Sequence, residues 1–478
     1  MKSPIAVLTL VFAASSVVPA QTLTTLVNQP PAGAGLAFLL TDGTVLSQAS
    51  NDHDWYKLTP DAFGNYVNGT WTQVGSLPAG YVPDAFSSAV LADGSVVIAG
   101  GEYNNGAFVL TNKAAIYNPL LGTWTALGHP SGWANIGDSP SVVLPNGFFL
   151  IGCKLDMNMA VLNPKTLEWT EVGSTGKSDF FAEEGWTLLP DGTILTADVL
   201  NVPNSERYFP STQTWVSQGS TIVDLAAPST VGPISYPGGV YDPPGEIGPA
   251  ILRPDGTVFA TGASNHATAH TAVYHPGATS GTEGTWTVGP DFPSDDNAGD
   301  SSAALLTSGN VLVLGDSGQL YEFDGTNLTP TLRPSRTAYL MVLPTGQVIL
   351  TGGRIQVYNS TGTYSPSWAP AITSHPSAVT PGSTYSISGT QFNGLSQAAS
   401  FGDEFQTATN YPLVRITNTG TGHVFYARTH NHSTMGVATG SEIVSTNFDV
   451  PTTIDSGAST LEVVANGIPS PAVSITVN

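Results

Sequence analysis

The sequence predicts an all-β protein, a seven-bladed β-propeller followed by an immunoglobulin-like β-sandwich. Three observations lead to this prediction. Glycine (52 residues) and proline (36 residues) are abundant, whereas charged residues make up only 10% of the chain, a composition that suits many short strands joined by tight turns. One apolar phrase with a turn glycine recurs along residues 21–370, and it stops at about residue 371.

The N-terminus resembles an export signal. An apolar run from Ile5 to Val18 follows Lys2, and the triplet Val18-Pro19-Ala20 precedes Gln21, so residues 1–20 are expected to be a signal peptide. No other apolar run approaches the roughly 18 residues that suggest a spanning helix. We therefore expect no membrane span and a secreted protein, either periplasmic or extracellular.

The repeated phrase reads as a β-hairpin. Each copy has an apolar stretch, a turn ending in glycine and a second apolar or β-branched stretch, as in "VLADGSVVIAGG" (90–101). The turn glycines of the seven copies are Gly43, Gly94, Gly147, Gly192, Gly256, Gly309 and Gly346. Seven copies of such a unit predict seven blades.

A second phrase after each hairpin supplies a third and an outer fourth strand. Examples are "AAIYNPLLGTWT" (114–125) and "MAVLNPKTLEWT" (159–170). The expected outer-strand markers are Trp71, Trp124, Trp169, Trp215, Trp286, Leu328 and Trp368. Residues 21–370 are therefore predicted to form the propeller. Residues 371–478, with alternating stretches such as "TYSISG" and "AVSITVN", are predicted to form the sandwich.

The net charge argues against one class of function, and the cysteine count excludes internal disulfide bonds. A formal net charge of −22 with only 13 Lys and Arg residues argues against nucleic-acid binding. Cys153 is the single cysteine, so no internal disulfide can form. Its setting in the apolar run "FFLIGCKL" predicts a buried small hydrophobe.

These repeats resemble the kelch propellers, and the whole layout is similar to the galactose oxidase and glyoxal oxidase superfamily. The resemblance implies a loop of the last domain that inserts along the propeller axis. It also implies one copper ion held by two His and two Tyr, with one Tyr cross-linked to a Cys. The segment "RTHNHSTMG" (428–436) is similar to the family's inserted Thr-His segment, which makes His430 and His432 candidate metal ligands.

The other copper ligands do not match. Arg336-Thr337 stands where the family has a Tyr-His pair, and Tyr339 is displaced by about three residues. Cys153 closes a second strand, whereas the family's cross-linked Cys opens an inner one. The sequence therefore disfavours a copper-radical centre.

Acidic residues lead into five successive inner strands. They are Asp84, Asp138, the pair Glu183 and Glu184, Glu246, and Asp300. Converging carboxylates must hold protons, bind cations or be separated by water. With histidine added, we expect a divalent cation site for Ca²⁺, Zn²⁺ or Mn²⁺ at one axial mouth. The alternative is that these acids only accept hydrogen bonds from backbone N–H groups at the strand starts.

The expected partner is a polar small molecule or a carbohydrate. Arg336 suits an anionic group, and aromatic side chains such as Trp186 and Tyr339 suit a sugar ring. The first hypothesis is a secreted binding propeller without the copper-radical set. The alternatives are a carbohydrate or alcohol oxidase with altered copper ligands, and a surface or interaction scaffold. No catalytic residue can be assigned from the sequence.

Overall fold

The computed structural model describes residues 20–50, 52–265, 268–279 and 281–478. The expected signal peptide therefore lies almost wholly outside the described residues. Within them the chain is almost entirely β, with two single-turn 3₁₀ helices, η1 (Pro293–Asp295) and η2 (Pro366–Trp368). No helix among the described residues is long and apolar enough to cross a membrane.

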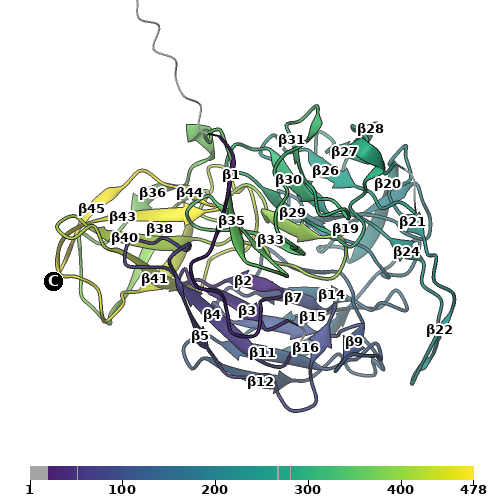
Figure 1. Cartoon of the computed structure of the whole chain (residues 1–478), viewed down its shortest axis with the longest axis horizontal. Coiled ribbons are helices and arrows are strands. Elements are labelled where there is room, and N and C mark those ends of the chain that lie inside the picture. Colours follow the sequence, from purple (N-terminus) through teal and green to yellow (C-terminus); the bar gives the residue numbers. More distant parts are fainter. Residues whose placement is uncertain (1–19, 51, 266–267, 280) are drawn as a thin grey trace, which may run out of the picture.

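Seven four-stranded antiparallel units form the propeller, and the inner strands of most neighbouring units contact one another around the axis (Figure 1). From axis to rim, blade one is β2 (Ala37–Leu39), β3 (Val45–Gln48), β4 (Trp55–Thr59) and β5 (Thr70–Gln73), and blade two is β7 (Ser87–Val90), β8 (Val96–Ala99), β11 (Ala114–Asn118) and β12 (Thr123–Leu127). Blade three is β13 (Ser141–Val143), β14 (Phe149–Gly152), β15 (Met159–Asn163) and β16 (Glu168–Val172). Blade four is β17 (Thr187–Leu188), β18 (Ile194–Ala197), β19 (Asn204–Phe209) and β20 (Thr214–Ser220). Blade five is β25 (Ala250–Leu252), β26 (Val258–Thr261), β27 (Thr271–His275) and β28 (Thr285–Val288). Blade six is β29 (Ser302–Leu305), β30 (Val311–Leu314), β31 (Leu320–Phe323) and β32 (Leu328–Pro330). Blade seven is β33 (Tyr339–Val342), β34 (Val348–Thr351), β35 (Gln356–Asn359) and β1 (Thr22–Thr25).

The predicted propeller is confirmed, and its repeats behave as expected. All seven turn glycines have a positive φ, between 75° at Gly43 and 87° at Gly147, a region that glycine enters without steric cost. The outer-strand markers lie on the outer strands in the first six blades.

The seventh blade differs from the prediction. Trp368 lies in η2, and the outer strand of this blade is β1 from the N-terminal end of the described chain. β1 pairs with β35 in antiparallel register from Thr22↔Asn359 to Thr25↔Gln356. The ring is therefore closed by joining two segments that lie more than 300 residues apart.

Three short additions project from the blades. In blade two, β6 (Pro83–Asp84), β9 (Tyr103–Asn104) and β10 (Ala107–Phe108) make a small sheet. Between blades four and five, β21 (Ala227–Pro228) pairs with β24 (Gly245–Glu246), and they enclose a hairpin of β22 (Ile234–Tyr236) and β23 (Gly239–Tyr241).

The C-terminal part begins with β36 and forms one continuous path of strands with its own core. Its strands are β36 (Ala371–Ser374), β37 (Ala378–Val379), β38 (Thr384–Thr390), β40 (Leu413–Asn418), β41 (Val424–His430), β42 (Val444–Asp449), β43 (Gly457–Ala465), β44 (Ile468–Pro469) and β45 (Val473–Val477). β41 pairs with β40 through its first half and with β42 through its last three residues. Figure 1 shows these strands beside the propeller, in yellow and light green.

One strand of the C-terminal part belongs to the propeller. β39 (Ala399–Phe401) is the fifth strand of blade six and pairs with the inner strand β29, from Ser302↔Phe401 to Ala304↔Ala399. It also contacts the inner strands of blades five and seven. Phe401 and Phe405 join the hydrophobic core of blades one to three and seven, so the two parts of the chain share a core.

Candidate functional site

A segment of the C-terminal part runs along the propeller axis, and we call residues 395–409 the axial segment. Its first limb contains β39, and the side-chain oxygen of Gln397 accepts a hydrogen bond from the backbone N–H of Leu188 on β17 (2.8 Å). Its second limb is held by Ser88 on β7, whose hydroxyl accepts from the N–H of Gln406 (3.1 Å) and donates to its carbonyl oxygen (3.2 Å). Both limbs are thus fixed to inner strands of different blades.

The tip of the axial segment, Gly402 to Phe405, reaches the end of the channel where the inner strands begin. A Cβ atom added to Gly185 would lie 2.4 Å from the carbonyl oxygen of Gly402, so the tip packs directly against the backbone beside Glu183 and Glu184. Asp403 and Glu404 are only 2% and 4% exposed. We call this end of the channel the axial mouth.

Carboxyl groups from several blades meet the tip at the axial mouth. Glu183, Glu246 and Asp403 each offer an oxygen within 4.8 Å of the others, and so do Asp300, Asp403 and Glu404. Asp403 Oδ1 and Glu404 Oε2 are buried and accept no hydrogen bond within the protein. A buried charged acceptor without a partner is strongly unfavourable, so these oxygens call for a proton or a cation.

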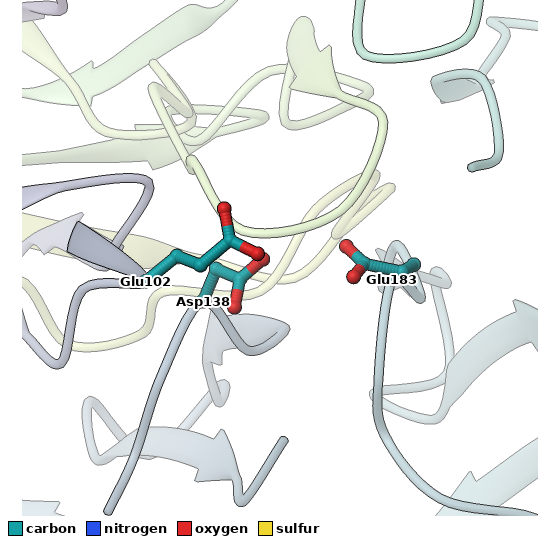
Figure 2. A group of neighbouring side chains, drawn as sticks. All are labelled: Glu102, Asp138 and Glu183. Carbon is teal, nitrogen blue, oxygen red and sulfur yellow. The ribbon is translucent and has the colours of Figure 1, made fainter. Parts of the chain in front are cut away.

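A third group of acids is already occupied by a lysine. Figure 2 shows Glu183 facing Glu102 and Asp138, and the three groups lie within 4.8 Å of one another. Lys154, which is completely buried, donates to Asp138 Oδ2 and Glu183 Oε1, and its Nζ lies 3.7 Å from Glu102 Oε1. Burial opposes the charged form of this lysine, but Asp138 and Glu183 outweigh that effect and raise its pKa well above the usual value.

Glu184 belongs to a separate buried cluster rather than to the axial mouth. Its carboxylate accepts a hydrogen bond from Lys177 Nζ (2.6 Å), which also donates to Asp179 and to Glu206 Oε2 (2.7 Å). Glu183 lies in a turn with a positive φ of 59°, and the two neighbouring carboxylates bind different lysines, Lys154 and Lys177, so the pair is split between two sites. The prediction that Glu184 joins the axial acids is therefore wrong.

Proton affinity at the axial mouth is raised by burial and by like charges. Burial, followed by the charges of Glu183 and Asp300, raises the pKa of Glu246 to about 9. Burial and Glu183 raise the pKa of Asp300 to about 6, and burial and Asp300 raise the pKa of Glu404. Without a cation, part of this carboxylate set therefore carries protons at neutral pH.

A pocket of about 240 Å³ opens beside these acids, and Glu246, Asp300 and Asp316 line it together with Asn265 and Asn297. Asp300 is exposed to solvent there although protein surrounds it on most sides. The mouth is therefore reachable by a small polar molecule.

Aromatic side chains from two hairpins meet at one side of the mouth. The ring of Phe108 on β10 contacts the rings of Tyr236 and Tyr241, with centroid distances of 6.0 and 5.9 Å. Tyr241 donates its hydroxyl to Glu183 Oε1 (2.8 Å), which ties this aromatic group to the acids.

The histidines of "RTHNHSTMG" lie at the opposite end of the channel. The N–H of His432 bonds to the carbonyl oxygen of Ala92 (3.3 Å), which follows the inner strand β7, whereas Asp84 precedes β7. His430 Nε2 lies 3.1 Å from Asp449 Oδ1, and His432 Nδ1 lies 2.9 Å from Thr446 Oγ1. The expectation that this segment enters the axis beside the acids is wrong, because it continues β41 in the C-terminal sheet.

Two of the remaining predicted residues, Tyr339 and Asp84, lie near the axial mouth. Tyr339 lies at the mouth, where its ring packs against Phe401 and Phe405, and burial followed by the nearby Asp84 and Glu404 raises its pKa. Burial also raises the pKa of Asp84.

Trp186 does not line the mouth as predicted, whereas the ligand-binding role of Arg336 stays a prediction. Arg336 is exposed, and no ion pair joins it to an acid in the described parts of the chain. Trp186 is 1% exposed and packs against Phe181 and Trp215, which leaves no face for a ligand.

Sequence reasoning missed the residues at the centre of the mouth, namely Asp403, Glu404, Glu102 and Lys154. One signal was present for the first two: adjacent acids stand between Phe401 and Phe405 in a stretch that is otherwise apolar or uncharged. Nothing in the local sequence distinguishes Glu102 or Lys154 from ordinary loop residues.

The donors at the mouth do not fit the copper centre that the resemblance implies. Over the described residues, the groups of three or more side chains able to hold a metal contain only Asp and Glu, without His or Cys. Cys153 is buried, and its Sγ lies 3.4 Å from Asn135 Oδ1. Carboxylate oxygens favour hard cations such as Ca²⁺, Mg²⁺ and Mn²⁺.

Comparisons with known proteins agree with the fold. No family model matches the sequence. The kelch-like protein terF of Aspergillus terreus is 25% identical over 131 residues, which span 27% of this chain and about a quarter (26%) of that relative. Among solved structures, a fungal alcohol oxidase of the AA5 family in complex with copper is 14% identical, covers 96% of this chain and 98% of its own, and has a TM-score of 0.52. A streptogramin B lyase covers 73% of this chain and 100% of its own at 14% identity, with a TM-score of 0.47. The chain is thus a kelch-like β-propeller that resembles the galactose oxidase superfamily in fold.

Proposed function

We propose that this protein is an exported binding protein whose axial mouth holds a divalent cation and, through that cation, a polar ligand of the carbohydrate type. One observation carries the proposal: the tip of the axial segment brings Asp403 and Glu404, with two buried oxygens that accept no hydrogen bond, against Glu183, Glu246 and Asp300. A cation would satisfy these oxygens and would offset the repulsion among the carboxylates.

The donor set favours Ca²⁺ or Mn²⁺ over Zn²⁺ and copper. Every candidate ligand atom is a carboxylate oxygen, and Ca²⁺ takes six to eight oxygen donors, usually including some from water or a bound ligand. The two histidines that would have favoured Zn²⁺ are held at the other end of the channel by Asp449 and Thr446.

A polyhydroxylated ligand suits the surroundings of this cation. Vicinal hydroxyl groups can replace water on a hard cation, and the amide side chains of Asn265 and Asn297 line the same pocket. The rings of Phe108 and Tyr236 lie close by, and the apolar face of a sugar ring packs well on such side chains. An anionic ligand is disfavoured because Lys154 is the single cation among these acids and is already paired.

The proposal is tested by metal content and by thermal stability. The purified chain is stripped with a chelator, and Ca²⁺, Mn²⁺, Zn²⁺ and Cu²⁺ are added back separately while Tm is followed. We expect Ca²⁺ or Mn²⁺ to raise Tm and Asp403→Asn to abolish that rise. The control Glu442→Gln changes an exposed acid of the C-terminal part and should respond as the parent does.

Two outcomes would contradict the proposal. Stoichiometric copper together with hydrogen peroxide release on sugars or alcohols would favour the oxidase alternative. The absence of any metal-dependent rise in Tm would favour the scaffold alternative.

A further inference from the structure

Two sets of carboxylates at the axial mouth overlap in a single residue. One set is Glu183, Glu246 and Asp403, and the other is Asp300, Asp403 and Glu404. Within each set the three candidate ligand oxygens lie within 4.8 Å of one another, which is the spacing of ligands around one cation. Asp403 is therefore placed between two possible cation positions.

The chain's own lysines indicate which acid clusters need an external cation. Of the four clusters found in the described residues, one surrounds Lys154 Nζ and another surrounds Lys177 Nζ. Of the two clusters that share Asp403, the one with Asp300 and Glu404 forms no ion pair with a lysine in the described residues, whereas Glu183 of the other accepts a hydrogen bond from Lys154. In these clusters Asp403 Oδ1 and Glu404 Oε2 accept no hydrogen bond. The lysine clusters also hold two unpartnered oxygens, Asp138 Oδ1 and Asp198 Oδ1, but a lysine ammonium neutralises each of those carboxylates.

Charge balance favours two cations over one. The acids around the mouth are Glu102, Asp138, Glu183, Glu246, Asp300, Asp403 and Glu404, seven carboxylates that face the single ammonium of Lys154. When all are ionised, one divalent cation would leave four negative charges uncompensated in a largely buried site, whereas two would leave two. Buried like charges within a few ångströms repel strongly, so the second cation has a large electrostatic driving force.

We propose that the axial mouth binds two divalent cations bridged by the carboxylate of Asp403. The first lies between Glu183 and Glu246, and the second lies between Asp300 and Glu404. This inference rests on the proposed function, because it describes how the same mouth holds its metal. Cations that share a bridging carboxylate lie about 3.5–4 Å apart, and an oxygen atom of a ligand can then contact both.

Glu246 of the first position and Asp300 of the second both line the pocket, and the second position is the more exposed of the two. Asp300 is exposed in the pocket of about 240 Å³, whereas Asp403 and Glu404 are buried beneath it. The open coordination positions of the second cation therefore face the pocket, and a pair of ligand hydroxyl groups can occupy them.

Stoichiometry tests the inference separately from the proposed function. The chelator-treated chain is dialysed against Mn²⁺, and bound metal is counted by elemental analysis. We expect two equivalents in the parent and in Glu442→Gln, one equivalent in Glu246→Gln, one in Glu404→Gln and none in Asp403→Asn. One equivalent in the parent would overturn the two-cation inference and leave the proposed function intact, whereas none would overturn both.

Electron paramagnetic resonance on the unmutated chain tests the bridge without relying on any variant. Two Mn²⁺ ions joined by a carboxylate couple magnetically, so the isolated six-line signal should be replaced by a broadened, multi-line spectrum. Two equivalents of Mn²⁺ that give only the six-line signal would overturn the bridging role of Asp403.

Discussion

Cation binding at the axial mouth should release protons, and Glu246 sets the size of the effect. Burial and the charges of Glu183 and Asp300 raise the pKa of Glu246 to about 9, so at pH 7 about 99% of this carboxyl group is protonated in the cation-free protein. A cation binds the ionised form and must displace this proton. Because the ionised fraction grows from about 1% at pH 7 to about 50% at pH 9, affinity should increase about ninefold between pH 7 and 8 and about fivefold between pH 8 and 9, or about 50-fold in total.

The assay is isothermal titration calorimetry with Ca²⁺ at pH 7, 8 and 9, repeated at pH 7 in two buffers with different ionisation enthalpies. The parent should release at least one proton per chain, and Glu404, whose pKa is also raised, adds to that number. Glu246→Gln should bind more weakly and should lower the proton release by about one. Glu442→Gln should retain the full pH dependence. An affinity for Ca²⁺ that stays constant from pH 7 to 9 in the parent would refute the reasoning.

Three further predictions concern stability and reactivity. Lys154→Met leaves Asp138 and Glu183 buried without their cation and should lower the free energy of unfolding at pH 8 by about 3–5 kcal/mol. The control Lys165→Met, at the surface, should lower it by almost nothing. Equal losses for the two variants in denaturant titrations would argue against the buried pairing. Burial raises the pKa of the Cys153 thiol to about 12, so thiol reagents should label the chain only after unfolding, and fast labelling of the folded protein would contradict this. Burial lowers the pKa of His432 to about 3, so below about pH 6.5 the unfolded chain takes up a proton that the folded chain does not. As pH falls from about 6.5 toward 3, this group should therefore lower the free energy of unfolding by up to about 1.4 kcal/mol per pH unit. His432→Gln should flatten that part of the stability curve, and an unchanged slope would show that other groups cause it.

The fold was predictable wherever it depends on local pattern. A turn glycine between two apolar stretches makes a hairpin whatever the rest of the chain does, so seven copies of the phrase predicted seven blades. The outer strand of the last blade was not predictable in this way. β1 is the short polar stretch Thr22–Thr25, and what makes it a strand is the free edge of β35, which lies far away in the sequence.

The placement of the acids was predicted in part, whereas their role as metal ligands stays a prediction. The position of acids before each inner strand correctly brought Asp138, Glu183, Glu246 and Asp300 to one end of the channel, because strands around an axis begin at the same face. The similarity of residues 428–436 to the family's Thr-His segment predicted the wrong segment for insertion along the axis. Spacing along a strand gives the face of a side chain but not the element against which the strand packs, so sequence alone could not place His430 and His432.

The axial segment makes the propeller inseparable from the C-terminal part. Every strand that closes the ring, including β1 and β33 to β35, precedes β39 in the chain, so a nascent chain possesses a complete ring before it possesses the strand that fills the channel. A fragment ending before residue 395 would leave the inner edge of β29 unpaired and the core partners of Phe401 and Phe405 exposed to water. The axial segment therefore fills the channel of the ring, and a truncation at the end of the repeats would produce an open, aggregation-prone ring.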